Sequence, residues 1–287
     1  MANLKEIRNR ISSIDSTKQI TNAMKMVSAA KLKKAQDSIT QMRPYAQKLQ
    51  ELLQNISATL DGNAGGEYTQ QREVESVLLV VFSSNKGLCG GYNSSVFKEV
   101  TKLVKGEYAN KKVNIITIGK KATQFLGKTH QLKTSLLDIV DKPSFEEVVK
   151  ITDEIISSYI KNEVDKVVFV YNQFKNAGTQ IVQTEQFLPV QFSNDGSSTT
   201  NMDYIFEPNK EEIVTDLIPK TLKMQFYKAL LDSIASEHGA RMTAMHKATD
   251  NAQDLLNELK LTYNKARQAS ITTEILEIVG GAAALDG

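Results

Sequence analysis

Hydrophobic residues recur every three or four positions along the first 60 residues. Stepping alternately by three and four from Leu4 gives seventeen positions, of which thirteen are apolar. They are Leu4, Ile7, Ile11, Ile14, Lys18, Thr21, Lys25, Ser28, Leu32, Ala35, Ile39, Met42, Ala46, Leu49, Leu53, Ile56 and Leu60. This seam predicts a long coiled-coil helix over residues 1–60. Pro44 removes one backbone hydrogen bond, so we expect a kink or a break near it.

The four polar seam positions are consecutive. They are Lys18, Thr21, Lys25 and Ser28. In this stretch the apolar residues move around the side of the helix, to Ile20, Ala23, Met24, Val27 and Ala30. Two interpretations are open. Either the supercoil adjusts locally, or the helix faces a different environment there.

The C-terminal segment has a similar period. Alternating steps from Met245 reach the following positions: Ala248, Ala252, Leu255, Leu259, Thr262, Ala266, Ala269, Thr273 and Leu276. Small residues at six of these nine positions permit a close, slender helix pair. Helical character begins at about Glu211, is interrupted at most near Pro219, and is expected to end at Gly280 and Gly281. We assign this helix to residues 208–285 and expect it to pair antiparallel with residues 1–60.

The middle of the chain, residues 74–192, alternates strands with helices. The predicted strands are Val77–Ser84, Val113–Gly119, Lys166–Phe174 and Thr179–Val190. The predicted helices are Val96–Val104, Lys120–Leu126 and Phe145–Ile160. This alternation predicts a mainly parallel sheet with helices on its faces and one antiparallel edge hairpin. Residues Ser193–Asn209 are polar and predict a surface loop.

Composition narrows the class of protein. Cys89 is the only cysteine in 287 residues, which excludes an intramolecular disulfide and favours a reducing compartment. No apolar run is long enough to span a bilayer. Residues 1–50 carry ten Lys and Arg against three acids, a net charge of +7, although the whole chain carries only +2. Such a basic segment suggests an acidic partner, namely a protein surface, a nucleic acid or lipid headgroups.

A glycine-rich loop, SSNKGLCGGYN, follows the first predicted strand. Its glycines Gly87, Gly90 and Gly91 are spaced G-x-x-G-G, which matches neither the dinucleotide fingerprint nor the phosphate loop. The second strand ends in Gly119-Lys120-Lys121, with no acid to bind a ribose. We therefore interpret the glycines as turning the backbone, and we predict no cofactor site.

The sequence predicts no catalytic or metal-binding group. Cys89 has no histidine near it in sequence and is typical of a small buried residue. His130 stands alone, and His238 and His246 lie eight residues apart on a helix, a spacing that does not resemble a metal pair.

Three stretches together resemble one family. They are ITNAMKMVSAAKLKKAQ (20–36), SSNKGLCGGYN (83–93) and YNKARQASITTEILEIVGGAAAL (263–285). In order and spacing they are similar to the gamma subunit of the F-type rotary ATP synthase, over nearly the whole chain. The resemblance implies an α+β or α/β fold class, with a long antiparallel coiled coil of the terminal helices and a central Rossmann-like α/β domain.

The resemblance also implies a function. A gamma subunit is the central rotor shaft that couples ion translocation to ATP synthesis or hydrolysis at the beta subunits, and it has no catalytic site or cofactor of its own. The implied partners are the alpha and beta subunits of the catalytic hexamer, the epsilon subunit and the ring of c subunits. The implied location is the cytoplasmic face of a bacterial plasma membrane, with membrane contact only through the complex. The absence of a transit peptide and of the cysteine-bearing chloroplast insert favours a bacterial enzyme.

The resemblance also assigns individual contact residues, by their position in this sequence. The resemblance implies that Met24, Lys25 and Lys31 lie near the acidic lever segment of beta. It likewise implies that Gln268, Thr272 and Glu274 lie in the partner helix that contacts beta. Judged from the residues alone, each is equally a seam or a solvated residue.

Two other functions remain open on the residues alone. A small Rossmann-like enzyme with a helical dimerisation arm would bind its ligand at Gly87–Gly91. A basic coiled-coil tether would bind nucleic acid, but the chain lacks the interleaved aromatic residues and the sustained basic face of such proteins. We therefore expect no nucleic-acid partner.

Overall fold

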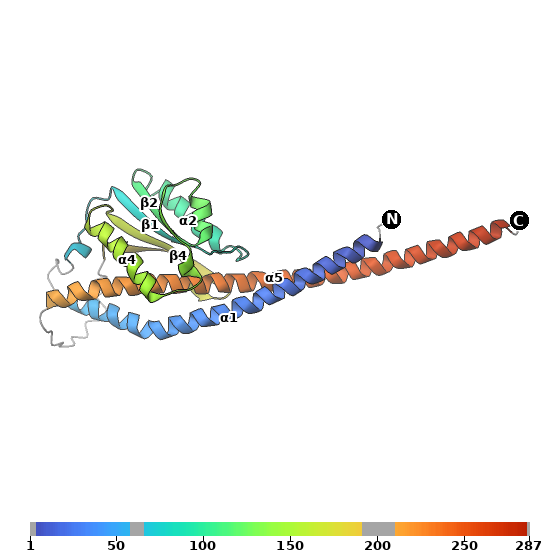
Figure 1. Cartoon of the computed structure of the whole chain (residues 1–287), viewed down its shortest axis with the longest axis horizontal. Coiled ribbons are helices and arrows are strands. Elements are labelled where there is room, and N and C mark those ends of the chain that lie inside the picture. The colour runs from blue at the N-terminus through green and yellow to red at the C-terminus, as the bar shows by residue number, and fades with distance from the viewer. Residues whose placement is uncertain (1–3, 58–65, 191–209, 286–287) are drawn as a thin grey trace. The chain divides into compact units, whose positions relative to one another are not determined.

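The computed structural model describes residues 4–57, 66–190 and 210–285 (Figure 1). The chain forms two compact units. The smaller contains residues 1–28 and 242–287, and the larger contains residues 29–241. The predicted loop at 193–209 and the expected end of the first helix at 58–60 lie outside the described residues.

The two terminal helices are more continuous than predicted. Helix α1 spans Leu4–Ser57 and runs through Pro44, so the break allowed for at that residue is absent. Helix α5 spans Lys210–Leu285 and runs through Pro219. It also continues through Gly280 and Gly281, so the predicted end at these glycines is wrong. A glycine lowers helix stability by only about 1 kcal/mol relative to alanine, which does not force a helix to stop.

Within the smaller unit, α1 and α5 pack antiparallel, as predicted. The guanidinium of Arg8 donates a hydrogen bond of 2.8 Å to the hydroxyl of Tyr263. The hydroxyl of Thr249 donates a bond of the same length to Thr21. Partner numbers on α5 fall as those on α1 rise, which is the signature of an antiparallel pair.

The predicted seam of α1 is confirmed throughout its described length. Every seam position from Leu4 to Leu53 is buried or half-buried, including the four polar positions. The buried face therefore does not move around the helix between Lys18 and Ser28. The apolar flank instead stays exposed, and Ile20 and Val27 each keep 59% of their surface.

The predicted seam of α5 is partly wrong. Met245, Ala248, Ala252, Leu259, Ala266 and Thr273 are covered as expected. From Leu255 onward the alternate positions are shifted by one residue, because the buried leucine is Leu256 and Leu255 is 40% exposed. The observed steps therefore alternate four and three from Ala252, where three and four were predicted. Leu276, the last predicted position, is exposed.

The larger unit contains a five-stranded sheet. Its strands are β1 (Ser76–Phe82), β2 (Lys112–Ile118), β3 (Leu132–Leu136), β4 (Lys166–Asn176) and β5 (Thr179–Leu188). Their order is β3-β2-β1-β4-β5, and all neighbours are parallel except β4 and β5. The parallel sheet with an antiparallel edge was predicted. Strand β3 was not, because its central residues Lys133–Ser135 are polar and exposed.

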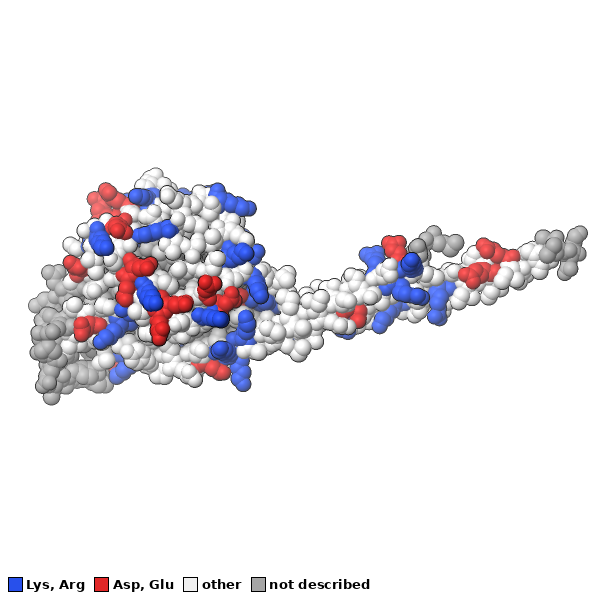
Figure 2. All heavy atoms as spheres, viewed as in Figure 1, with Lys and Arg blue, Asp and Glu red and all other residues white. Residues whose placement is uncertain are grey.

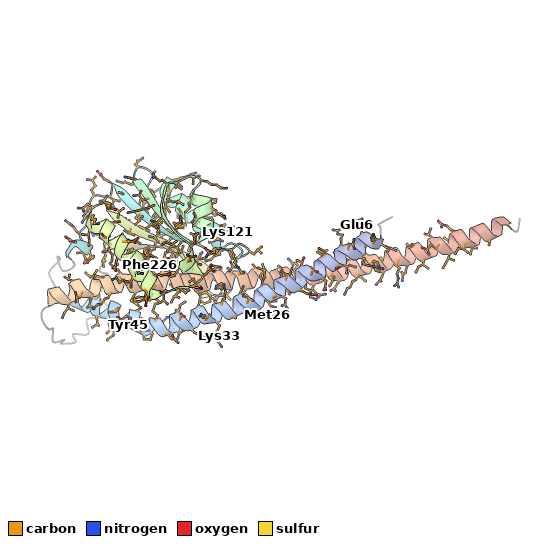
Figure 3. All side chains as sticks on the ribbon, in the orientation of Figure 1. Glu6, Met26, Lys33, Tyr45, Lys121 and Phe226 are labelled. Atoms are coloured by element: carbon orange, nitrogen blue, oxygen red, sulfur yellow. The ribbon has the colours of Figure 1, made fainter. Side chains whose placement is uncertain are left out.

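Helices cover both faces of the sheet. Helices α2 (Tyr92–Lys105) and α3 (Lys120–Leu126) cover one face, where they bury Val77, Leu79 and Val81 of β1. Helix α4 (Phe145–Ile160) lies on the other face, together with the first part of α5. There Phe226 of α5 packs edge-on against Phe82 and Phe169, at 5.6 and 5.4 Å between ring centroids (Figure 3). Strand β1 is thus buried on both faces, which explains its continuous apolar run.

Candidate functional site

The glycine loop, Ser83–Asn93, connects β1 to α2 at the carboxyl end of the sheet. Only Gly90 of its three glycines has a positive φ, of 57°. At Gly87 and Gly91 a Cβ atom would make only ordinary contacts. The interpretation that the glycines turn the backbone therefore holds at Gly90 alone.

The carbonyl groups of this loop bind an arginine of α5. One Nη of Arg241 lies 2.9 Å from the carbonyl oxygen of Lys86 and 3.3 Å from that of Gly87. The other Nη donates a 2.6 Å bond to Glu237, one helical turn earlier. Both side chains are at least nine-tenths buried. Burial raises the pKa of Glu237, and Arg241 opposes that rise.

The polarity of the loop is opposite to that of a phosphate site. Phosphate-binding loops point backbone N–H groups at an anion. Here two carbonyl oxygens converge on a guanidinium that is already paired with a carboxylate. The arrangement accordingly pairs a buried cation with a carboxylate and two carbonyl oxygens.

Side chains of α5 also fill the crevice between β1 and β4, where α/β sheets of this kind bind ligands. The hydroxyls of Tyr92 and Ser233 lie 2.6 Å apart. The amide of Asn172 donates to the carbonyl of Tyr92 at 3.0 Å, and Ser236 donates to the carbonyl of Asn172 at 2.9 Å. The glycine loop, β4 and α5 are therefore joined by one buried polar network, in the place where a dinucleotide would lie.

Cys89 belongs to the same network. Its Sγ accepts a 3.1 Å bond from Asn93 and lies 3.7 Å from the hydroxyl of Ser84. Burial raises the pKa of the thiol, so it remains protonated and unreactive. The prediction of a small buried cysteine is confirmed.

The predicted contacts on α1 fall in both units. Met24 and Lys25 are half-buried in the smaller unit, beside Met26, which is 59% exposed (Figure 3). The seam beneath them is polar, with Thr21 and Ser28 buried. Lys31 belongs to the larger unit and is exposed.

The predicted contacts on α5 all lie on its exposed end. Gln268, Thr272 and Glu274 follow Tyr263, the partner of Arg8 in the first turns of α1. The hydroxyls of Ser270 and Thr272 bond within the helix, to Glu274 and to the carbonyl of Gln268. Nothing brings these residues together with Met24 or Lys25 into one described site.

Comparison with known proteins identifies the family. The sequence profile of the family described as ATP synthase matches residues 3–285. The ATP synthase gamma chain of Flavobacterium johnsoniae is 64% identical over 287 residues, covering 100% of both chains. That of Cytophaga hutchinsonii is 50% identical over 294 aligned residues, also with complete coverage. The chain belongs to the ATP synthase gamma chain family.

Solved structures agree with this family. A chain in the central stalk and c-ring structure of Tetrahymena thermophila mitochondrial ATP synthase matches with a TM-score of 0.60 and 27% identity, covering 80% of this chain and 99% of that one. A chain of the Euglena gracilis mitochondrial enzyme shares the fold, with a TM-score of 0.68 at 22% identity over 98% of this chain and 94% of that one. As a gamma chain, the protein is a non-catalytic subunit of the central stalk.

Sequence reasoning missed two structural features of this gamma chain. The first is Arg241, whose loop partners lie more than 150 residues away. The local sequence offered one signal for this contact, which is a Glu and an Arg four positions apart on a predicted helix, Glu237 and Arg241. The second is the run of exposed apolar residues at the end of α5, which are Ile271, Ile275, Leu276, Ile278 and Val279.

Two further observations concern metal binding and membrane insertion. Across residues 4–57, 66–190 and 210–285, no group of three or more His, Cys, Asp or Glu side chains is placed to hold a metal ion. Within the same ranges, every helix is too short or too polar to cross a bilayer.

Proposed function

We propose that this gamma chain transmits torque between the ion-translocating ring and the catalytic hexamer. It does so through changing contacts of its helices with the alpha and beta subunits. Helices α1 and α5 each contribute residues to both compact units, so each can carry force along one continuous hydrogen-bonded rod. Torque transmission needs contacts whose free energy differs among the conformations of beta.

The single observation that best supports this proposal is the unpartnered apolar surface of the smaller unit. Ile20, Met26 and Val27 are each 59% exposed on α1, although polar residues occupy the seam beneath them. The five apolar residues at the end of α5 are also exposed. Large exposed apolar residues grouped this way are typical of a surface that another protein covers.

Charge supports an acidic partner beside α1. Lys25 and Lys31 belong to a basic stretch with Lys18, Lys33 and Lys34. We propose that Met24, Lys25 and Lys31 meet the acidic lever segment of beta, and that Gln268, Thr272 and Glu274 meet beta from the end of α5. Rim charges of this kind set orientation and rate more than affinity, which suits a contact that must break every turn.

The remaining partners follow from the same role. We propose that the α/β domain meets the epsilon subunit and the c-ring, at the cytoplasmic face of the bacterial plasma membrane. The bacterial gamma chains that resemble this one support that location.

The test is the coupling ratio of ATP-driven ion pumping to ATP hydrolysis in inverted membrane vesicles. Replacing Met24→Lys adds a charge beside Lys25 on the contact face. We expect a lower ratio with an unchanged amount of assembled complex. Ser12→Lys is the matched control, because it adds the same charge at an exposed position of α1 that lies about three helical turns before Met24. Normal pumping by the Met24→Lys complex would refute this placement of the contact.

A further inference from the structure

The outer surface of helices α2 and α3 carries an aromatic hollow. It is lined by Ser94, Phe97, Lys98, Thr101 and Phe125, and it has a volume of about 370 Å³. The rings of Phe97 and Phe125 are stacked, with centroids 4.6 Å apart and planes within 6°. Phe125 keeps 49% of its surface exposed. We call this surface the Phe97–Phe125 hollow.

The polar residues of the hollow offer few free donors. Ser94 donates its hydroxyl to the carbonyl of Gly91 at 3.0 Å, and Thr101 donates to the carbonyl of Phe97 at 2.7 Å. Because these hydroxyls are already bonded to their own helix, the hollow presents mainly rings, methyl groups and methylenes. It therefore suits an apolar side chain better than a polar small molecule.

The core of the domain does not explain the exposed ring. The core beneath α2 and α3 is closed by buried Val96, Val100, Ala122 and Leu126. Phe97 packs against that core from its edge, whereas Phe125 extends the aromatic surface outward. A half-exposed stacked phenylalanine adds little to folding, but it is the kind of rigid anchor that protein interfaces use.

The rim of the hollow is basic. Helices α2 and α3 together contain five lysines and one acid, Glu99, which is paired with Lys102 at 3.3 Å. Among the residues that the structure describes, neither Lys98 nor Lys121 forms an ion pair. Figure 2 shows basic side chains along the edge of the domain where Figure 3 labels Lys121. An apolar centre with a one-signed rim specifies a partner of opposite charge.

We propose that the Phe97–Phe125 hollow docks an acidic amphipathic segment of another subunit in the assembled complex. An aromatic or branched side chain of that segment enters the hollow, and flanking carboxylates face Lys98 and Lys121. This surface belongs to the α/β domain and is separate from the helical contacts proposed above. The docking proposal can therefore be refuted or supported independently of the proposal on torque transmission.

The test is site-specific photo-cross-linking in the purified, assembled complex. Benzoylphenylalanine is incorporated in place of Phe125 and, as a matched control, in place of Phe145. Phe145 is 42% exposed and packs on Tyr227 at the opposite face of the sheet. Irradiation from position 125 should give a cross-link to an Asp- and Glu-rich peptide of another subunit, whereas position 145 should not reach that peptide.

A second variant tests the rim. In the position-125 protein, Lys98→Glu together with Lys121→Glu should lower the cross-link yield about tenfold, with assembly and hydrolysis unchanged. The proposal is overturned if position 125 links to no other subunit, or only to lipid, to a second copy of this chain or to a segment without acids. It is also overturned if charge reversal leaves the yield unchanged. Coupling measured with Met24→Lys does not depend on any of these results.

Discussion

Replacing Arg241→Met should destabilise the larger unit more than any exposed substitution on α5. The change removes the cation that pairs with Glu237 at 2.6 Å, and it frees the carbonyls of Lys86 and Gly87. Breaking a buried ion pair on one side typically costs about 3–5 kcal/mol, because the remaining charge stays buried without a partner. We expect a loss in that range in the free energy of unfolding.

A double substitution separates charge from packing. Glu237→Gln removes the buried carboxylate, so Glu237→Gln with Arg241→Met should be more stable than Arg241→Met alone. The unpaired loop carbonyls remain and should still cost about 1–3 kcal/mol. Lys220→Met is the matched control at an exposed position of α5, and it should change stability by less than about 0.5 kcal/mol.

The assay is urea denaturation of the purified chain, followed by circular dichroism and tyrosine fluorescence. Hydrogen–deuterium exchange of residues 84–92 provides a local readout. In Arg241→Met these amides should exchange at least about tenfold faster, because loop opening no longer breaks the arginine bonds. If the single variant lost less than about 1 kcal/mol and kept its loop protection, Arg241 would not hold the glycine loop in place.

Two further predictions concern pH and helix register. Burial raises the pKa of Asp232 to about 6, so its contribution to stability falls as pH rises from 3.8 to about 6, by at most about 3 kcal/mol. Burial and the charge of Arg241 lower the pKa of His238 to about 4, so stability rises over pH 4 to 6.5 and offsets the effect of Asp232. Denaturation between pH 4 and 6.5 should therefore show a rising profile for Asp232→Asn and a falling one for His238→Gln, and parallel profiles would contradict these assignments. Leu256→Ala should cost about 2–4 kcal/mol and Leu255→Ala less than 1, since only Leu256 is buried, and equal midpoints in urea would disprove the observed register.

The elements that the sequence predicted well carry their own local signal. Strands β1 and β4 are continuous apolar runs because both of their faces are covered, and their residue types alone indicate that burial. The seam of α1 could be predicted across its polar stretch, because the apolar positions before Lys18 and after Ser28 follow the same heptad register. Helix α4 was predicted at both of its observed ends, and α3 at its observed start.

The features that sequence reasoning missed depend on distant residues. Strand β3 is a polar edge strand, and only its pairing with β2 makes it a strand. On α5 two adjacent leucines, Leu255 and Leu256, satisfy either order of steps, and only the partner helix chooses between them. The bond between Arg241 and the glycine loop joins positions that nothing local connects. The same is true of the Phe97–Phe125 stack.

The arginine that completes the glycine loop is made late in synthesis. The last strand of the sheet ends at Leu188, and Arg241 follows it 53 positions later. A nascent chain that has already formed all five strands still lacks the side chains that fill the crevice and cap the loop carbonyls. Translation of α5 therefore finishes the α/β domain, and a chain that ends before residue 241 leaves the crevice and the loop carbonyls open to water.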